Sequence, residues 1–223
     1  WVVSGSRGQE GRDTTSVLLD GSRGDTSATI DGSTLASYAL VFAMRSEPSG
    51  VGVLLTINPN NANALAYAAG GTILQGDPEK YEQAQVFADD AVRLEPENAI
   101  ARYYMATVFT YQGRYTEAME QYQRGIEADP GNPNLHIGLA YNYYGTGSIP
   151  DALLSFEDAI AVDPDNAEAF DGRAYMYLQL GDAPLAEQNA LEATRLNPNM
   201  ARAQGRLGEA FFRQNNYAEA VDA

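Results

Sequence analysis

The sequence predicts a mostly α-helical protein, a solenoid of about 4.5 stacked helical pairs, with a small β-rich segment at its N-terminus. Two observations predict this fold class: prolines recur every 34 residues, and several series of small residues recur in the same phase. The prolines are Pro96, Pro130, Pro164 and Pro198, and the series are Ala84, Ala118, Ala152, Ala186 and Ala220, then Ala106, Ala140, Ala174 and Gly208, then Gly113, Gly147, Gly181 and, substituted, Asn215. Self-similarity at a fixed period of this length indicates a repeat array.

Apolar residues at helical spacing predict two helices in each repeat. Between Pro130 and Gly147 they lie four residues apart, at Leu135, Leu139 and Tyr143. From Ile149 to Val162 the same stripe returns, at Leu153, Phe156 and Ile160.

Glycine and proline predict the connection between the two helices. Gly147 stands where the residue that ends a helix adopts a left-handed conformation. Pro150 and Pro184 follow as the first residues of the second helices, where the missing N–H costs little. Each unit is therefore expected to be two antiparallel helices with alanine at their closest approach. Such pairs must stack, because a single pair cannot bury its apolar face.

The repeat resembles the tetratricopeptide repeat family. The resemblance rests on the 34-residue period, the Gly113-Arg114-Tyr115-x-x-Ala118 turn and the Asp129-Pro130 ending, and it covers roughly residues 58–223. It implies a right-handed α-α superhelix over 59–223, after a Ser/Thr/Gly-rich segment over 1–58. The expected units are 62–98, 99–132, 133–166, 167–200 and a partial 201–223, and the first carries three extra residues around 76–79.

The resemblance also implies a binding surface, because the inner face of this superhelix, lined by the first helix of each pair, usually holds a peptide. The lining residues would be Tyr103, Thr107, Tyr111, Tyr141, Tyr144, Asp171, Tyr175 and Gln179. The lysines and asparagines with which some members grip a C-terminal carboxylate are missing here. Tyrosine is prominent instead: 13 of the 14 tyrosines lie in the repeats. They suit either ordinary helix packing or contact with a partner.

Three arginines of the last unit form a cationic stripe. Arg202, Arg206 and Arg213 share one side of the expected first helix. Two interpretations remain open for this stripe: it meets the acidic surface of another copy, or it is a solvated helix face.

Composition excludes several classes of function. The chain has no cysteine and one histidine, His136, so thiolate chemistry and histidine clusters are excluded, and we expect neither metal nor cofactor. His136 lacks an acidic or nucleophilic partner at catalytic spacing, and we expect no enzyme activity. With a formal charge of −16, binding to nucleic acid or to anionic membranes is not expected. No apolar run is long enough to enter a bilayer. The compartment stays open, with an extracellular location favoured over a cytoplasmic one.

The first 58 residues differ in composition from the repeats, since serine, threonine and glycine supply 23 of them. Short apolar stretches at 17–19 and 28–30 precede Asp-Gly turn signals, which predicts strands and turns. For residues 34–57 there are two alternatives, a pair of strands or a decayed helical pair. We favour strands, because Pro48 and two glycines interrupt any helix there.

Two hypotheses for function follow, both requiring a protein partner. In the first, a structural subunit assembles head to tail into a filament, because strand edges and solenoid ends both invite pairing. Its assembly edge would comprise Trp1, Val2 and Val3 at one end, and Leu207, Phe211, Tyr217 and Ala220 at the other. In the second, a scaffold binds a partner peptide in the tyrosine-lined groove.

Overall fold

The computed structural model describes residues 2–4, 16–18, 61–74 and 76–216. These fall into two compact units, Trp1–Val108 (unit 1) and Phe109–Ala223 (unit 2), each described by itself below. Trp1, Tyr217 and Ala220 of the predicted assembly edge lie outside the described residues, as do the strands predicted within 19–60.

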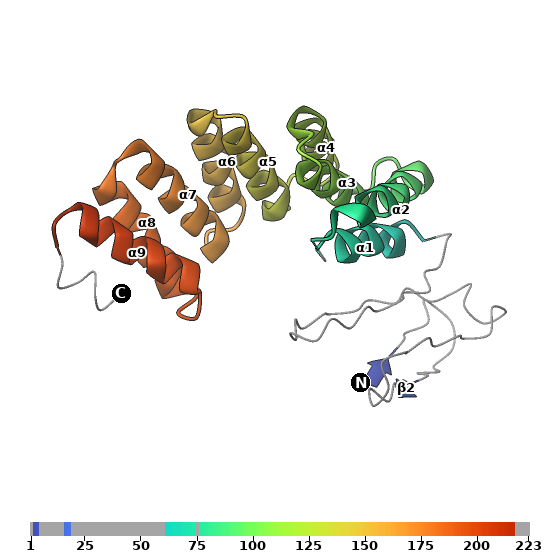
Figure 1. Ribbon diagram of the computed structural model, residues 1–223, viewed down its shortest axis with the longest axis horizontal. Helices are drawn as coiled ribbons and strands as arrows, with labels where there is room; N and C mark the ends of the chain where they lie inside the picture. The colour runs from blue at the N-terminus through green and yellow to red at the C-terminus, as the bar shows by residue number, and fades with distance from the viewer. Residues whose placement is uncertain (1, 5–15, 19–60, 75, 217–223) are drawn as a thin grey trace. The chain divides into compact units, whose positions relative to one another are not determined.

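The described part of the repeats is helical throughout apart from its turns, which confirms the predicted fold class. Unit 1 contains α1 (Ala62–Ile73), the short 3₁₀ helix η2 (Pro78–Lys80), α2 (Tyr81–Leu94) and most of α3 (Ala99–Tyr111). Unit 2 contains the end of α3, then α4 (Tyr115–Ala128), α5 (Pro133–Gly145), α6 (Ile149–Val162), α7 (Ala167–Leu180), α8 (Ala183–Leu196) and α9 (Ala201–Arg213). Consecutive helices pack as pairs, as Figure 1 shows for α5 with α6 and α7 with α8. The predicted extra residues of the first unit form η2 and its approach.

The turns within the repeats adopt the predicted left-handed geometry. Gly113, Gly147 and Gly181 have φ of 75°, 85° and 78°, and Asn215, which replaces glycine in the fourth turn, has φ of 62°. In each turn the next residue's N–H bonds to the carbonyl five residues before it, as Ser148 does to Tyr143 at 2.8 Å. These bonds satisfy carbonyls that the ends of the first helices would otherwise leave open.

Asparagine begins most of the first helices. Asn98 and Asn166 each accept a hydrogen bond through Oδ1 from the backbone N–H three residues later, at 3.0 Å. Asn132 accepts one from the N–H of Asn134 at 3.1 Å. Side-chain acceptors at this position satisfy N–H groups that have no partner within the helix, so the cap defines where each repeat starts.

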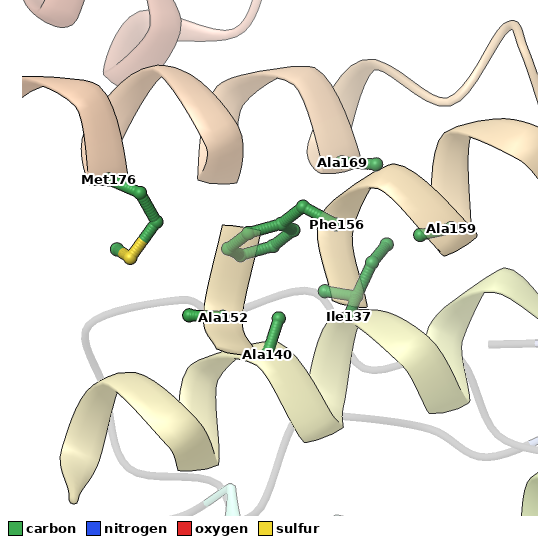
Figure 2. Packing of buried hydrophobic residues seen from close by; sticks show 7 residues of the cluster. All are labelled: Ile137, Ala140, Ala152, Phe156, Ala159, Ala169 and Met176. Atoms are coloured by element: carbon green, nitrogen blue, oxygen red, sulfur yellow. The ribbon is translucent and has the colours of Figure 1, made fainter. Parts of the chain in front are cut away.

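The repeats pack around small residues and one large ring. The predicted alanine series is fully buried where the structure describes it, with Ala84, Ala118, Ala152 and Ala186 all 0% exposed. The largest fully buried side chain is Phe156. Figure 2 shows its ring between α5, which supplies Ile137 and Ala140, and α7, which supplies Ala169 and Met176. Phe156 therefore joins the predicted unit 133–166 to the next one.

Near the N-terminus, β1 (Val2–Ser4) pairs with β2 (Ser16–Leu18) in a two-stranded antiparallel sheet. The register sets Val2 opposite Leu18 and Val3 opposite Val17. The backbones of Val2 and Val3, predicted to pair with another chain, are thus paired on one side within this chain.

Three tyrosines of unit 1 form a cluster that fills a gap left by a glycine. The ring of Tyr104 lies edge-on to Tyr67, at 5.4 Å between centroids, and to Tyr103, at 5.1 Å. A Cβ on Gly70 would lie 2.2 Å from the Tyr104 ring, so only glycine fits beside it. Burial, with smaller contributions from Tyr103 and Tyr67, raises the pKa of Tyr104 to about 12.

We expect an ultraviolet absorbance titration of the folded protein to show a late tyrosinate step near pH 12, which Tyr104→Phe removes. Tyrosine in an unfolded chain has a pKa of about 10. The contribution of Tyr104 to stability is therefore complete below that pH and is lost as the pH rises through about 12. A Tyr104→Phe variant that loses absorbance change near pH 10 and keeps the step near pH 12 would contradict the prediction.

Candidate functional site

The first helices of three successive repeats bring the main predicted binding residues together. In unit 2, α7 contacts both α5 and α9. Four residues of the predicted lining lie here, Tyr141 and Tyr144 on α5, and Asp171 and Tyr175 on α7. The side chains of α9 that meet them belong to Arg202 and Arg206. We call Tyr144, Asp171, Tyr175, Arg202 and Arg206 the tyrosine–arginine site.

Two tyrosines of the site are joined by their hydroxyl groups. The hydroxyl oxygens of Tyr144 and Tyr175 lie 2.9 Å apart, and their rings meet edge to face at 5.3 Å between centroids. The guanidinium of Arg206 lies 4.5 Å from the centroid of the Tyr175 ring. A cation over a phenol ring is attracted by the negative potential of its face. Tyr175 is thus held from two sides, by α5 and by α9.

Asp171 lies beneath this surface and does not line it, which corrects the prediction. Its carboxylate is 0% exposed, with Oδ2 at 2.8 Å from Nε of Arg202 and Oδ1 at 2.8 Å from Nε of Arg206. Neither contact has the alignment of a hydrogen bond, so both are ion pairs. The reason for the burial is that α9 places both arginines across α7, where they cover the carboxylate.

The arginine stripe of α9 makes contacts within the chain, although the side chains of Arg202 and Arg213 stay 47% and 38% exposed. Nη1 of Arg206 donates to the Asp171 carbonyl at 2.9 Å, and Nη1 of Arg213 donates to the Leu178 carbonyl at 2.5 Å. Arg202 also pairs with Glu168 at 3.0 Å. In each of these two hydrogen bonds the arginine lies 35 residues after the residue whose carbonyl it contacts, which is one residue more than the repeat period. Contacts at this separation arise because the first helices of successive repeats lie side by side. The stripe is therefore a set of bonds from α9 to α7.

Two tyrosines of this region, Tyr141 and Tyr144, have raised pKa values. The hydrogen bond with Tyr175, aided by burial, raises the pKa of Tyr144. Burial raises the pKa of Tyr141 as well, and nearby Arg202 opposes the rise. For Asp171 burial raises the pKa, while Arg206 and Arg202 favour the charged form and limit the rise. With two guanidinium groups at 2.8 Å, we take Asp171 to be ionised at neutral pH.

The remaining residues of the predicted lining each have their own surroundings. The ring of Tyr141 packs edge-on against Phe156, 5.2 Å between centroids, and so belongs partly to the core. Thr107 donates its hydroxyl to the carbonyl of Tyr103 one turn earlier on α3, at 2.9 Å. Tyr111 and Gln179 are exposed near the ends of α3 and α7. The structure thus concentrates the predicted surface on two tyrosines.

At the last described helix, two residues of the predicted assembly edge, Leu207 and Phe211, pack inward. Leu207 is only 8% exposed, packed with Ala174 and Ala190, and Phe211 packs against the same cluster. Both therefore pack against side chains of the preceding repeat, Ala174 on α7 and Ala190 on α8. Phe212 is instead 62% exposed, at the position where Leu178 is buried in the preceding repeat. Counting 34 residues forward from Leu178 identifies Phe212 from the sequence.

The described part of the chain offers few other groups suited to catalysis or metal binding. His136 is 9% exposed, and its Nε2 has no hydrogen-bond partner among the described residues. Within the same residues, no group of three histidine, aspartate or glutamate side chains is placed to hold a metal ion. None of the helices described is both long and apolar enough to traverse a membrane.

Comparison with protein families identifies the class of protein that this fold defines. Two family models, each described as Tetratricopeptide repeat, match the chain, one over residues 109–176 and the other over 76–133 and 173–223. The chain belongs to the tetratricopeptide repeat family, as the sequence predicted. Proteins of this family mediate protein–protein interactions and generally act as non-enzymatic scaffolds, so the fold implies protein partners.

Similar solved structures share the fold at low sequence identity. A structure from a functional characterisation of Pseudomonas aeruginosa pilF is 20% identical, with a TM-score of 0.66 and 72% of each chain covered. TTC0263, a thermophilic TPR protein of Thermus thermophilus, is also 20% identical, with a TM-score of 0.61 over 72% of this chain and 87% of that one. YrrB, described as a TPR protein with an unusual peptide-binding site, is 21% identical, with a TM-score of 0.52 over 74% of this chain and 84% of that one. No curated protein matches the chain.

Proposed function

We propose that this protein is a non-enzymatic adaptor that binds an extended peptide segment of a partner across α5, α7 and α9. The observation that carries the proposal is the tyrosine–arginine site. Its hydroxyl pair and its cation–π contact hold Tyr144 and Tyr175 in one arrangement. Aromatic and arginine side chains held before binding lose little conformational entropy when a partner arrives, and such residues dominate binding energy at interfaces.

The exposure of the side chains at the site and the family of the chain both support the proposed peptide-binding surface. Tyr144 and Tyr175 are partly exposed, and the side chain of Arg202 is 47% exposed, so a ligand can reach all three. The resemblance implies that Tyr144 and Tyr175 lie on the inner face, where the family usually holds peptides. YrrB, which has the same fold, is itself described as having a peptide-binding site.

The proposal is tested by selecting peptides directly. We expect a displayed library of random dodecapeptides, panned on the wild-type protein, to enrich peptides that the Tyr144→Ala/Tyr175→Ala double variant binds at least about tenfold more weakly. Isothermal titration calorimetry with a synthetic copy of an enriched peptide measures the loss. Tyr81→Ala, on a second helix of unit 1, is the matched control and is expected to leave binding unchanged. Enriched peptides that bind the double variant as tightly as the wild type would rule this surface out.

Head-to-tail self-association is the second candidate. The burial of Leu207 and the inward packing of Phe211 leave its predicted edge with two fewer exposed residues, which favours peptide binding over self-association. The observation that favours self-association is Phe212, an aromatic ring 62% exposed on the last described helix. Light scattering of wild type and Phe212→Ser over a range of concentrations tests it. Masses that stay monomeric in the wild type would count against self-association.

A further inference from the structure

We infer that the tyrosine–arginine site binds an uncharged, extended stretch of peptide through its main-chain carbonyl oxygens, and neither an anionic nor a cationic group. This inference rests on the proposed function and adds the chemistry of the ligand to it. It follows from the charges within the site, from the hydrogen-bonding groups that remain free, and from the charge of the whole chain.

The charges of the site cancel. Arg202 contacts two carboxylates, Glu168 at 3.0 Å and Asp171 at 2.8 Å, and Arg206 contacts Asp171 at 2.8 Å. With Glu168, the neighbour of the site that pairs with Arg202, the two cations meet two anions and the net charge is zero. Asp171 is 0% exposed, so this neutralisation happens beneath the surface that a ligand touches. An incoming carboxylate or phosphate would meet guanidinium groups whose charge is already compensated.

The groups left for a ligand are hydrogen-bond donors. Arg202 uses Nε and Nη2, and Arg206 uses Nε and Nη1, so Nη1 of Arg202 and Nη2 of Arg206 have no acceptor among the described residues. Of the two hydroxyl protons of Tyr144 and Tyr175, one occupies their mutual hydrogen bond and the other is available. A ligand that matches this site supplies acceptors. A lysine or arginine supplies only donors, whereas the Asp171 oxygens are buried and the Glu168 carboxylate is already paired with Arg202 at 3.0 Å.

The charge of the whole chain disfavours anionic ligands. A formal charge of −16 repels acidic segments as they approach, and the neutral ion pairs of the site do not offset this repulsion. The ligand groups that remain are hydrogen-bond acceptors without net charge. Main-chain carbonyl oxygens meet this requirement in any peptide sequence, and an extended chain presents them at regular intervals.

The test uses the dodecapeptide library of the preceding section. Peptides enriched on the wild type are expected to lack a shared acidic or basic residue, and their affinity is expected to change less than about twofold between about 50 and 500 mM NaCl. Asp171→Asn and, separately, Glu168→Gln each leave the site with one uncompensated positive charge. Selection on either variant is expected to enrich Asp- or Glu-containing peptides that bind it at least about tenfold better than the wild type at low salt.

Glu168→Gln keeps the inference testable if Asp171→Asn fails to fold, because the Glu168 side chain is 44% exposed. Acidic or basic wild-type peptides with strongly salt-dependent affinity would overturn this inference and leave peptide binding standing, provided that they need Tyr144 and Tyr175. An unchanged peptide preference in folded Glu168→Gln also overturns it. Enriched peptides that do not need the two tyrosines overturn both proposals.

Discussion

Replacing Phe156 with alanine is expected to lower the free energy of unfolding of unit 2 by about 3–5 kcal/mol. The ring is 0% exposed at the junction of α5, α6 and α7, and it meets Tyr141 edge-on at 5.2 Å. Removing it leaves a cavity that the surrounding residues can fill only in part, because small alanines supply much of the wall. Urea denaturation followed by circular dichroism measures the loss.

Leu154→Ala is the matched control for this prediction. Leu154 lies on the same helix, but 59% of it is exposed, and its truncation is expected to change stability by no more than about 0.5 kcal/mol. Similar losses for the two variants would contradict the assignment of Phe156 as the side chain that joins adjacent repeats.

The second large effect is expected at a glycine. Gly172→Ala should destabilise unit 2 by about 1–3 kcal/mol, although alanine is the better helix former. A Cβ at Gly172 would lie 2.2 Å from the Phe156 ring, which is buried and has no room to move aside. Gly172 therefore lets α7 approach α6 closely enough to cover the ring. The measurement is again urea denaturation, with unfolding expected at lower urea.

A second glycine and a double variant separate packing from helix propensity. Gly205 lies in the interior of α9 with nothing within 4 Å of its Cβ position, so Gly205→Ala is expected to stabilise the protein by up to about 1 kcal/mol. Combining Gly172→Ala with Phe156→Leu, which replaces the ring with a smaller side chain, should cost less than the sum of the single changes. Equal effects at the two glycines, or strict additivity in the double variant, would show that the contact with Phe156 is not the cause.

The repeat itself could be read from the sequence because it depends on local rules. Gly147 and its equivalents were predicted to be left-handed, since a tight turn after a helix needs positive φ, and the structure has φ of 85° at Gly147. The full burial of Ala152 and its equivalents follows from the close approach of paired helices. These features involve residues near one another in the chain, and the pattern can be recognised because it occurs in four or more repeats.

The binding surface could be predicted only in outline. The resemblance identified the first helices and named Tyr144 and Tyr175, yet it assigned Asp171 to the surface and left the arginines of α9 unpaired. The partners of Asp171 lie one repeat away, and their contacts depend on how far α9 is shifted along α7. The 35-residue spacing between donor and acceptor reveals this shift, but the sequence alone does not distinguish it from a spacing of 34.

By itself, then, the sequence determined the family, the helical pairs and the turns of this protein. These features depend on the 34-residue period and on glycines and alanines whose effects are confined to a single repeat. Only the tertiary structure decided that Asp171 is buried, that Arg202 and Arg206 neutralise it, and that Leu207 is packed inside the array. The physical reason is that side chains on neighbouring helices meet according to rotation and shift between whole helices. A change of one residue, about 100° around a helix, moves a side chain from the core to the surface.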